Sequence, residues 1–296
     1  MPYCSKCGAE LDGEATFCPK CGTPAGPPVT KPERRTTHGR RRKQMSTLAI
    51  ILIALITAAV VVAAVLAAAF FLGAWHPFGQ IIGSGNLITQ EKSFSDFSAV
   101  DVGSGFEVEI TQSSSYTVKI TADDNVLDHI IVSKTGDTLT IRLRLGYSFQ
   151  SVTLRGKITM PELRELELSG GTHGTVKGFS SSHEFVAELS EGSHLSGDLR
   201  TSGDAKFSLS GGSHLSKLDG AASDLGVSAS SGSHVDLSDF PVHDASVNLN
   251  GGSHATINVD GRLDADLSGG SHLFYIGDPT MGDIETSGGS TVSKNP

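Results

Sequence analysis

The sequence contains no cysteine after Cys21, only one tryptophan, and no Asn-x-Ser/Thr glycosylation sequon among its 296 residues. The part of the chain beyond Cys21 therefore forms no disulfide bond, whatever compartment it occupies. No Gly-Lys-Ser or Gly-Lys-Thr sequence occurs, so the phosphate-binding loop of nucleotide hydrolases is missing as well. Aromatic residues make up 6% of the chain while glycines number 35, which indicates a repetitive body with tight turns and no large aromatic core.

Charge is unevenly distributed along the chain. Residues 1–45 hold nine Lys/Arg and four Asp/Glu, which leaves 14 of the 23 Lys/Arg and 28 of the 32 Asp/Glu for the remainder. The first segment is basic and the rest of the chain is strongly acidic. Since an acidic body repels phosphates, nucleic acid is not an expected partner.

Residues 1–24 contain two Cys-x-x-Cys-Gly knuckles, and the four predicted metal ligands are Cys4, Cys7, Cys18 and Cys21. In each knuckle the glycine lets the backbone curl so that amide groups face the sulfurs, and four thiolates suit tetrahedral Zn²⁺. The alternatives are a pair of disulfides or a redox motif. The segment resembles the short zinc ribbon domains at the start of many prokaryotic membrane proteins. Four cysteines leave no open coordination position, so the zinc is expected to be structural.

A membrane span is predicted over residues 47–73, between a Pro/Gly-rich and basic linker (25–46) and a juxtamembrane linker (74–84). Leu48 to Leu72 is an uncharged run of 25 residues, long enough as a helix to cross a bilayer. Such a run is too long, and begins too late in the chain, for a cleaved signal peptide. We therefore expect a single-pass anchor.

The charges flanking this span predict its orientation. A basic cluster ends at Lys43, just before the span, and the next Lys/Arg is Lys92. By the positive-inside rule the N-terminus lies in the cytoplasm. Reduced cysteines in the first segment and a cysteine-free remainder fit the same orientation. The expected location is the cell membrane, with the C-terminal domain outside the cytoplasm.

Residues 85–165 alternate apolar and polar side chains, the pattern of half-buried strands. Strands are expected around Phe106–Ile110 and Tyr116–Ile120, with a hairpin turn at Gly136-Asp137 and room for one helical turn within 123–130. This section is expected to start and cap the repeats that follow it.

Residues 166–296 repeat the phrase Ser-Gly-Gly-Ser-His, as in Ser210 to His214. The fifth position recurs at residues 173, 194, 214, 234, 254, 272 and 291, in steps of 21, 20, 20, 20, 18 and 19. A fixed period near 20 predicts a solenoid of stacked coils. Apolar triplets of constant parity, such as Ala205, Phe207 and Leu209, precede each glycine pair and predict strands that face a core. The fold class is therefore all-β, a parallel β-helix-like solenoid.

Three further stretches carry a family resemblance: Phe97-Ser-Ala-Val-Asp-Val-Gly-Ser-Gly-Phe-Glu-Val, Met160-Pro161-Glu-Leu and Tyr275-Ile-Gly-Asp-Pro. Together with the serial Ser-Gly-Gly-Ser they resemble the putative auto-transporter adhesin head GIN domain family, over about 85–296. The resemblance implies an exported, solenoid-like all-β domain with a role in adhesion. The family pattern requires the small residues and glycines, and assigns no role to histidine.

Six of the seven repeats end in histidine, and we call this set the histidine column: His173, His194, His214, His234, His254 and His272. In register, the rings would stack about 4.8 Å apart along one edge. Three interpretations remain open: a polar turn position copied by duplication, a transition-metal site between coils, or an acid-sensing surface. Adjacent Ser and His do not make a catalytic triad, so no enzyme is expected.

The sequence thus predicts a membrane-anchored envelope protein whose exterior solenoid serves adhesion or surface interaction. Its expected ligand is an extracellular protein or a glycan, although the scarcity of aromatic platforms favours a glycan less. The alternative is a transmembrane sensor in which the zinc ribbon binds a cytoplasmic protein partner. The ribbon distinguishes the two, because adhesion alone gives no reason for a folded cytoplasmic module.

Overall fold

The computed structural model describes residues 3–12, 15–24 and 79–295. The chain divides into two compact units, Met1–Phe71 and Leu72–Pro296, each of which is described by itself. The predicted span over 47–73 lies outside the described residues. Among the residues that are described, no helix is long and apolar enough to cross a membrane.

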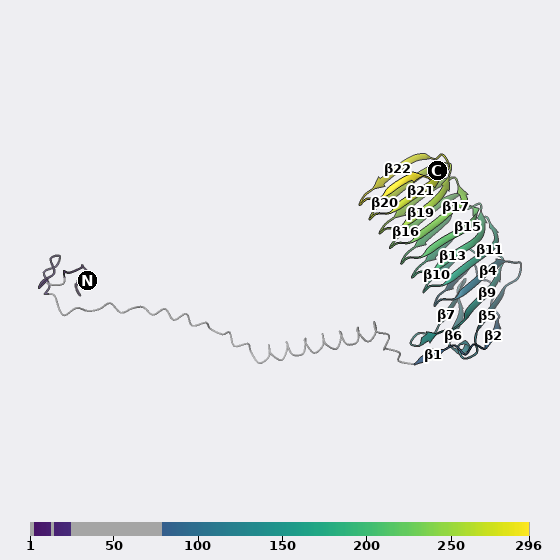
Figure 1. The fold of residues 1–296 in the computed structure, drawn as a ribbon, viewed down its shortest axis with the longest axis horizontal. Coiled ribbons are helices and arrows are strands. Elements are labelled where there is room, and N and C mark those ends of the chain that lie inside the picture. The colour runs from purple at the N-terminus through teal and green to yellow at the C-terminus, as the bar shows by residue number, and fades with distance from the viewer. Residues whose placement is uncertain (1–2, 13–14, 25–78, 296) are drawn as a thin grey trace. The chain divides into compact units, whose positions relative to one another are not determined.

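The second unit is a β-solenoid built mainly from two large sheets, in which most neighbouring strands are parallel (Figure 1). From β10 onward the even-numbered strands form one sheet and the odd-numbered strands the other, so each consecutive pair is one rung. The even strands are β10 (Glu165–Leu168), β12 (Phe185–Leu189), β14 (Ala205–Leu209), β16 (Asp224–Ala229), β18 (Asp244–Leu249), β20 (Arg262–Leu267) and β22 (Thr280–Thr286). The odd strands are β11 (His173–Ser181), β13 (His194–Thr201), β15 (His214–Ala221), β17 (His234–Val242), β19 (His254–Val259), β21 (His272–Ile276) and β23 (Thr291–Lys294). The predicted all-β solenoid is confirmed.

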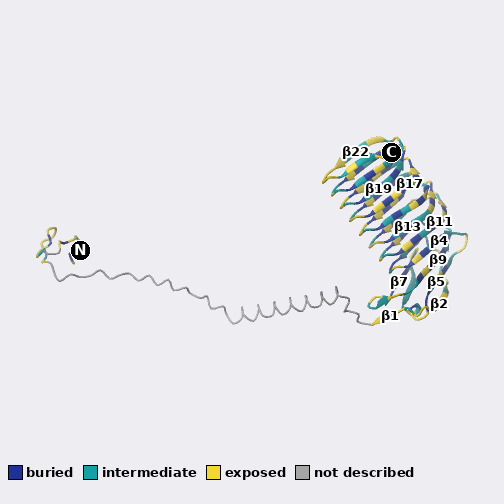
Figure 2. Cartoon of the chain, viewed as in Figure 1, coloured by how far each residue is buried: buried dark blue, intermediate teal, exposed yellow. Residues whose placement is uncertain are grey.

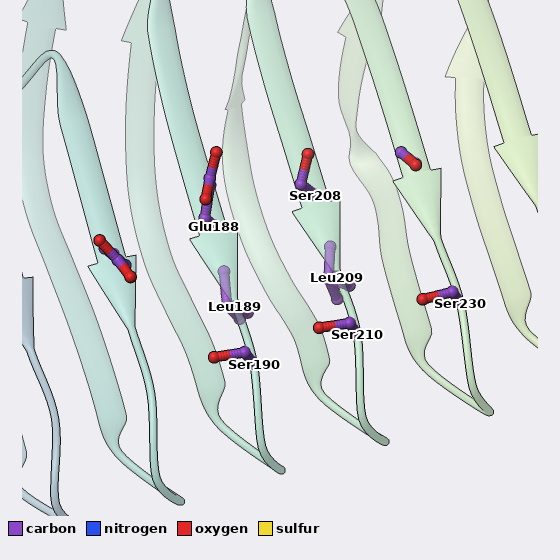
Figure 3. A pocket seen from close by; sticks show the side chains of 9 residues that line it. Glu188, Leu189, Ser190, Ser208, Leu209, Ser210 and Ser230 are labelled. Atoms are coloured by element: carbon purple, nitrogen blue, oxygen red, sulfur yellow. The ribbon is translucent and has the colours of Figure 1, made fainter.

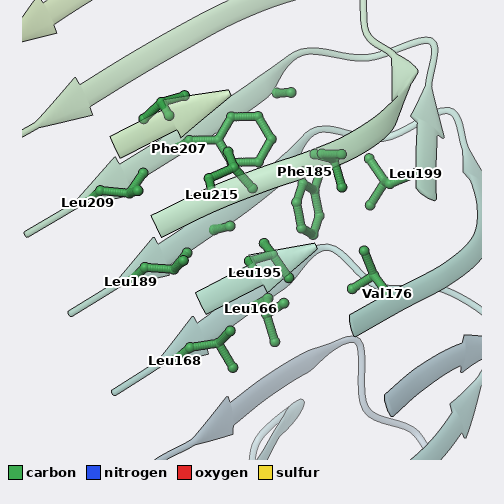
Figure 4. Close-up of a cluster of buried hydrophobic side chains, with 14 of the residues drawn as sticks. Leu166, Leu168, Val176, Phe185, Leu189, Leu195, Leu199, Phe207, Leu209 and Leu215 are labelled. Atoms are coloured by element: carbon green, nitrogen blue, oxygen red, sulfur yellow. The ribbon is translucent and has the colours of Figure 1, made fainter. Parts of the chain in front are cut away.

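Alternation along each strand places the core between the two sheets (Figure 2). Ala205, Phe207 and Leu209 of β14 are buried, and the residues between them are exposed. The same parity holds from rung to rung, so Leu189 lies beside Leu209 in the packed interior (Figure 4). The rings of Phe185 and Phe207 pack edge to face, with centroids 6.0 Å apart. Removal of these side chains from water is the main favourable contribution to folding.

A tight corner joins the two strands of each rung, and the repeated phrase provides it. Gly211 and Gly212 have φ of 64° and 73°, the left-handed region that glycine adopts without strain. Ser213, which follows them, is buried, and its hydroxyl donates to the Ser210 carbonyl at 2.7 Å. Equivalent bonds recur at Thr172, Ser193, Ser233, Ser253 and Ser271. A serine or threonine fits the position after the glycines, because its buried hydroxyl is satisfied by a hydrogen bond inside the corner.

The strand-rich start contributes rungs of its own, in an order that differs from the chain. Strands β3 (Ala99–Val102) and β4 (Glu107–Gln112) pair in parallel with β10 and β11. Strands β7 (Thr138–Leu143) and β9 (Leu154–Met160), which come later in sequence, lie on the far side of β3 and β4. The solenoid therefore begins before the first glycine repeat.

Antiparallel strands close this end of the stack. These are β2 (Leu87–Lys92), β5 (Thr117–Asp123) and β6 (Ile130–Thr135), with β1 (Gln80–Ile82), β8 (Ser148–Gln150) and the short 3₁₀ helix η1 (Leu127–His129) beside them. The expected hairpin turn at Gly136-Asp137 joins β6 to β7, and η1 is the expected helical turn. At the opposite end, residues 278–295 form the last rung, β22 and β23.

Buried Asp123 joins three segments at the antiparallel end. Its carboxylate accepts a hydrogen bond from the Thr153 amide at 2.7 Å and another from the Gly85 amide at 2.6 Å. These bonds, that of Thr153 first, lower the pKa of Asp123 and hold it ionised. The segments that follow β1 and β8 are thereby held to the end of β5.

Candidate metal centre and histidine column

The first unit contains two knuckles with the same backbone geometry. In the first, the Cys4 amide donates to the Ala9 carbonyl at 2.8 Å and the Gly8 amide to the Cys4 carbonyl at 2.9 Å. In the second, Cys18 and Gly22 make the corresponding bonds, again at 2.8 and 2.9 Å. Each Cys-x-x-Cys-Gly sequence thus forms the curl that its glycine permits, and the two curls place four sulfurs together.

The four sulfurs lie at the spacing that a tetrahedral metal requires. The Sγ atoms of Cys4, Cys7, Cys18 and Cys21 are all within 4.8 Å of one another. The Cys4–Cys21 and Cys7–Cys18 separations are 3.6 and 3.7 Å. Zinc–sulfur bonds of about 2.3 Å in a tetrahedron give sulfur–sulfur edges of about 3.8 Å. The residues therefore fit a four-thiolate metal ion.

Electrostatics in the first unit also suit a bound cation. The Lys6 amide, and then the Cys7 amide, lower the pKa of the Cys4 thiol. The hydroxyl and amide of Thr23 lower the pKa of Cys21 to about 6. The Ala9 amide acts in the same direction on Cys7, but neighbouring thiols, led by Cys21, and burial raise its pKa to about 11. Four thiolates this close repel one another, and a divalent ion removes that repulsion.

In the second unit, strand pairing brings the histidine column together. His173, His194, His214, His234, His254 and His272 are direct partners on successive odd strands. Their ring centroids are 5.4, 4.8, 5.0, 5.0 and 5.0 Å apart in that order. The first four pairs are parallel within 7°, and the last is tilted by 40°. Histidines at the same position of successive repeats therefore lie next to one another in space.

The column has a defined beginning and end. On one side His173 pairs with Glu107 of β4, whose carboxylate lies 3.3 Å from the Arg155 guanidinium. On the other side His272 pairs with Thr291, and its Nδ1 is 2.7 Å from the Thr291 hydroxyl. The seventh repeat, which has threonine in place of histidine, is therefore the final rung.

The column lies in a different electrostatic environment from His183 and His243. Burial, followed by the charge of neighbouring rings, lowers the pKa of His194 and of His234. By contrast, a hydrogen bond to Asp260 raises the pKa of His243, and His183 contacts Glu162. In the described ranges no ring of the column forms an ion pair with a carboxylate. The column is thus set apart from His183 and His243, each of which contacts a carboxylate.

A second surface feature was not foreseen from the sequence. A shallow groove of about 210 Å³ crosses the even-numbered sheet beside the corners (Figure 3). We call it the serine groove; its polar lining is Glu167, Glu188, Ser190, Ser208, Ser210, Ser228 and Ser230. Burial and then the Asp101 and Glu188 carboxylates raise the pKa of Glu167. The sequence did contain a signal for part of this lining. Glu167, Glu188, Ser208 and Ser228 are outward-facing residues of the even strands, and each comes directly before an inward leucine or alanine.

Each of the two units matches a known protein family. A family model described as putative auto-transporter adhesin, head GIN domain, matches residues 96–279, and a zinc-ribbon model matches residues 3–25. No curated protein matches the chain.

Solved structures from Bacteroides and Parabacteroides share the fold of the second unit. A putative adhesin from Bacteroides fragilis has a TM-score of 0.65 at 18% identity, covering 73% of this chain and 100% of its own. A putative adhesin from Parabacteroides merdae has a TM-score of 0.57 at 17% identity, with coverages of 73% and 99%. A putative lipid binding protein from Parabacteroides distasonis has a TM-score of 0.57 at 18% identity, with coverages of 73% and 100%. At these identities the likeness shows the fold alone.

Proposed function

The chain belongs to the putative auto-transporter adhesin, head GIN domain family, and on that premise we propose that it is a membrane-anchored envelope protein with a solenoid for surface interaction. The observation that carries the proposal is the family match over 96–279, which covers most of the solenoid. An adhesin-like family favours a surface or extracellular role and a non-enzymatic one. Extended solenoid faces commonly serve as binding surfaces.

The solenoid offers a polar surface to an extracellular protein or glycan. The serine groove presents hydroxyls at the rung spacing, flanked by the carboxylates of Glu167 and Glu188. Hydroxyls donate and accept, whereas carboxylates only accept, so the groove suits a ligand rich in hydrogen-bond donors. Sugar hydroxyls and backbone amides both meet that requirement.

The proposed anchor is the apolar run over 47–73, preceded by the linker 25–46 and followed by the juxtamembrane segment 74–84, which includes strand β1. In this arrangement the metal-binding ribbon, residues 1–24, is cytoplasmic and the solenoid, 85–296, is extracytoplasmic. The basic residues before the run, and the lack of any Lys or Arg between the run and Lys92, support the orientation. The metal is proposed to be structural zinc held by Cys4, Cys7, Cys18 and Cys21.

An adhesion assay tests the proposal. Bacterial cells that produce the full chain are compared with cells that produce a chain ending at residue 78, on surfaces coated with extracellular-matrix protein or mucin glycan. We expect several-fold greater retention of cells with the full chain, because only they display the solenoid. Equal retention on every surface, at equal protein levels in the membrane, would contradict a role in adhesion.

A second candidate function is favoured by the convergence of the four cysteines. A folded cytoplasmic ribbon suggests a transmembrane sensor, in which the exterior solenoid responds to the envelope and the ribbon binds a cytoplasmic protein. Affinity capture with residues 1–45 distinguishes this from anchoring alone. The sensor requires a reproducible partner that is lost in Cys4→Ser and Cys18→Ser, and its absence favours adhesion.

A further inference from the structure

The histidine column is a regular array of metal-ligating side chains that the adhesive function does not use. We propose that neighbouring histidines of the column bind divalent late transition-metal ions, such as Ni²⁺, Cu²⁺ or Zn²⁺, between successive rungs. The proposal is independent of the adhesive role and of the cysteine site. It rests on which ring atoms are accessible, on how far apart the rings lie, and on what surrounds them.

In His173, His254 and His272 the Nδ1 atom lies against the protein, which leaves Nε2 as the outward donor atom. His173 Nδ1 lies 3.1 Å from the Gly171 carbonyl, a contact in which Nδ1 carries the proton. His272 Nδ1 contacts the Thr291 hydroxyl, and His254 Nδ1 is buried without a hydrogen-bond partner. A ring protonated on Nδ1 has its lone pair on Nε2, the arrangement common in metal-bound histidine.

The spacing is close to that of a two-histidine site. Metal–nitrogen bonds of about 2.0–2.1 Å require the two nitrogens to lie within about 4.2 Å of each other. Parallel rings with centroids 4.8–5.0 Å apart are slightly too far, so neighbouring rings must turn toward one another. The His254 and His272 rings are already inclined by 40°. His173 and His234 are exposed and the others partly exposed, which leaves room for such rotation.

The surroundings favour transition metals over calcium or magnesium. Two residues after the histidines, on the same face, Thr175, Ser196, Ser216 and Thr256 are too small to cover an ion between the rings. Phe274 occupies this position beside His272. Beside His234 it is Asp236, whose carboxylate accepts hydrogen bonds from the Ser238 amide and hydroxyl. No carboxylate forms an ion pair with the column in the part of the chain that the structure describes. A site of imidazoles and water therefore selects nickel, copper or zinc, whereas calcium and magnesium need oxygen ligands.

Two variants that keep the same number of column histidines show whether metal binding needs neighbouring histidines or depends only on how many are present. The alternating variant, with His194, His234 and His272 all changed to Asn, leaves three histidines and no neighbouring pair. The block variant, with His234, His254 and His272 all changed to Asn, also leaves three histidines but keeps two neighbouring pairs. Each is made in the full chain without an affinity tag, with the cysteine site saturated with zinc beforehand.

Isothermal titration with Ni²⁺ at neutral pH tests the proposal, and circular dichroism checks that each variant is folded. We expect the wild-type chain to bind at micromolar concentration and the block variant to retain sites of similar affinity. The alternating variant should bind about tenfold or more weakly, because the second ligand no longer acts at high effective concentration. Lack of heat with the wild-type chain, or equal weakening in the two variants, would overturn the proposal. If the alternating variant does not fold, the other two titrations test the proposal. Ni²⁺ must then bind both the wild-type chain and the block variant, and lack of binding to either would contradict it.

Discussion

Replacing Gly220 with alanine is expected to destabilise the solenoid by on the order of 4 kcal/mol, or to prevent its folding. Gly220 is buried in β15 and has φ of 153°, which an L side chain rarely adopts. A Cβ atom there would lie 1.7 Å from the Leu199 carbonyl oxygen of the neighbouring rung and 3.0 Å from the Phe240 ring. Backbone on one side and a packed ring on the other leave the new methyl group no space.

Urea denaturation of the purified full chain, followed by far-ultraviolet circular dichroism, measures this loss. Gly226→Ala is the matched control, since Gly226 lies on the adjacent rung and a Cβ there meets only the flexible Lys206 side chain at 3.4 Å. The control should shift the unfolding free energy by less than about 0.5 kcal/mol. A Gly220→Ala protein as stable as Gly226→Ala would show that rungs do not approach as closely as described.

Replacing Cys4 or Cys18 with serine is expected to abolish metal binding and the fold of the first unit. In the described residues of this unit, 3–12 and 15–24, the buried core is Cys4, Leu11 and Cys18, so apolar burial there does not offset the loss of chain entropy. A structural zinc ion supplies ~10 kcal/mol to domains of this size. The lost ligand removes most of that contribution, whereas the solenoid, a separate compact unit, should keep its stability.

Elemental analysis of metal per chain, together with limited proteolysis, checks the cysteine prediction. After dialysis that strips weakly held ions from the histidine column, wild-type protein should keep one tightly bound zinc ion and resist cleavage within residues 3–24, while each serine variant should keep none and be cleaved there. Ser5→Ala is the control, because Ser5 lies in the first knuckle but is no ligand. Retention of zinc by both serine variants would contradict a four-cysteine site.

The period of the sequence was sufficient to predict the repeated rungs and the histidine register. Because rungs of a solenoid stack on themselves, a spacing of 18–21 residues between equivalent positions translates directly into strand pairing. Inward triplets such as Ala205, Phe207 and Leu209 were identified by parity alone, and they are buried. The cysteine pattern likewise predicted which sulfurs would converge.

The features of the solenoid that could not be predicted have no repeated sequence motif. The corner between β3 and β4 reads Gly103-Ser-Gly105 and has no histidine, so nothing marked these strands as rungs. Placement of β7 and β9 beyond them depends on long-range packing, because their neighbours in space are not their neighbours in sequence. The serine groove arises where outward side chains of separate rungs meet. Periodicity finds repeated local geometry, and it does not find the order in which unlike strands assemble.

Labelling with a membrane-impermeant maleimide tests the central claim most directly, namely that the solenoid lies outside the cytoplasm and the cysteine ribbon inside. Leu145→Cys places a thiol on a solenoid loop where the native side chain is 86% exposed. In intact bacteria this variant should be labelled, and the wild-type chain, whose cysteines all lie in residues 1–24, should be labelled only after lysis and metal chelation. Labelling of the wild-type chain in intact cells, or of Leu145→Cys only after lysis, would contradict it.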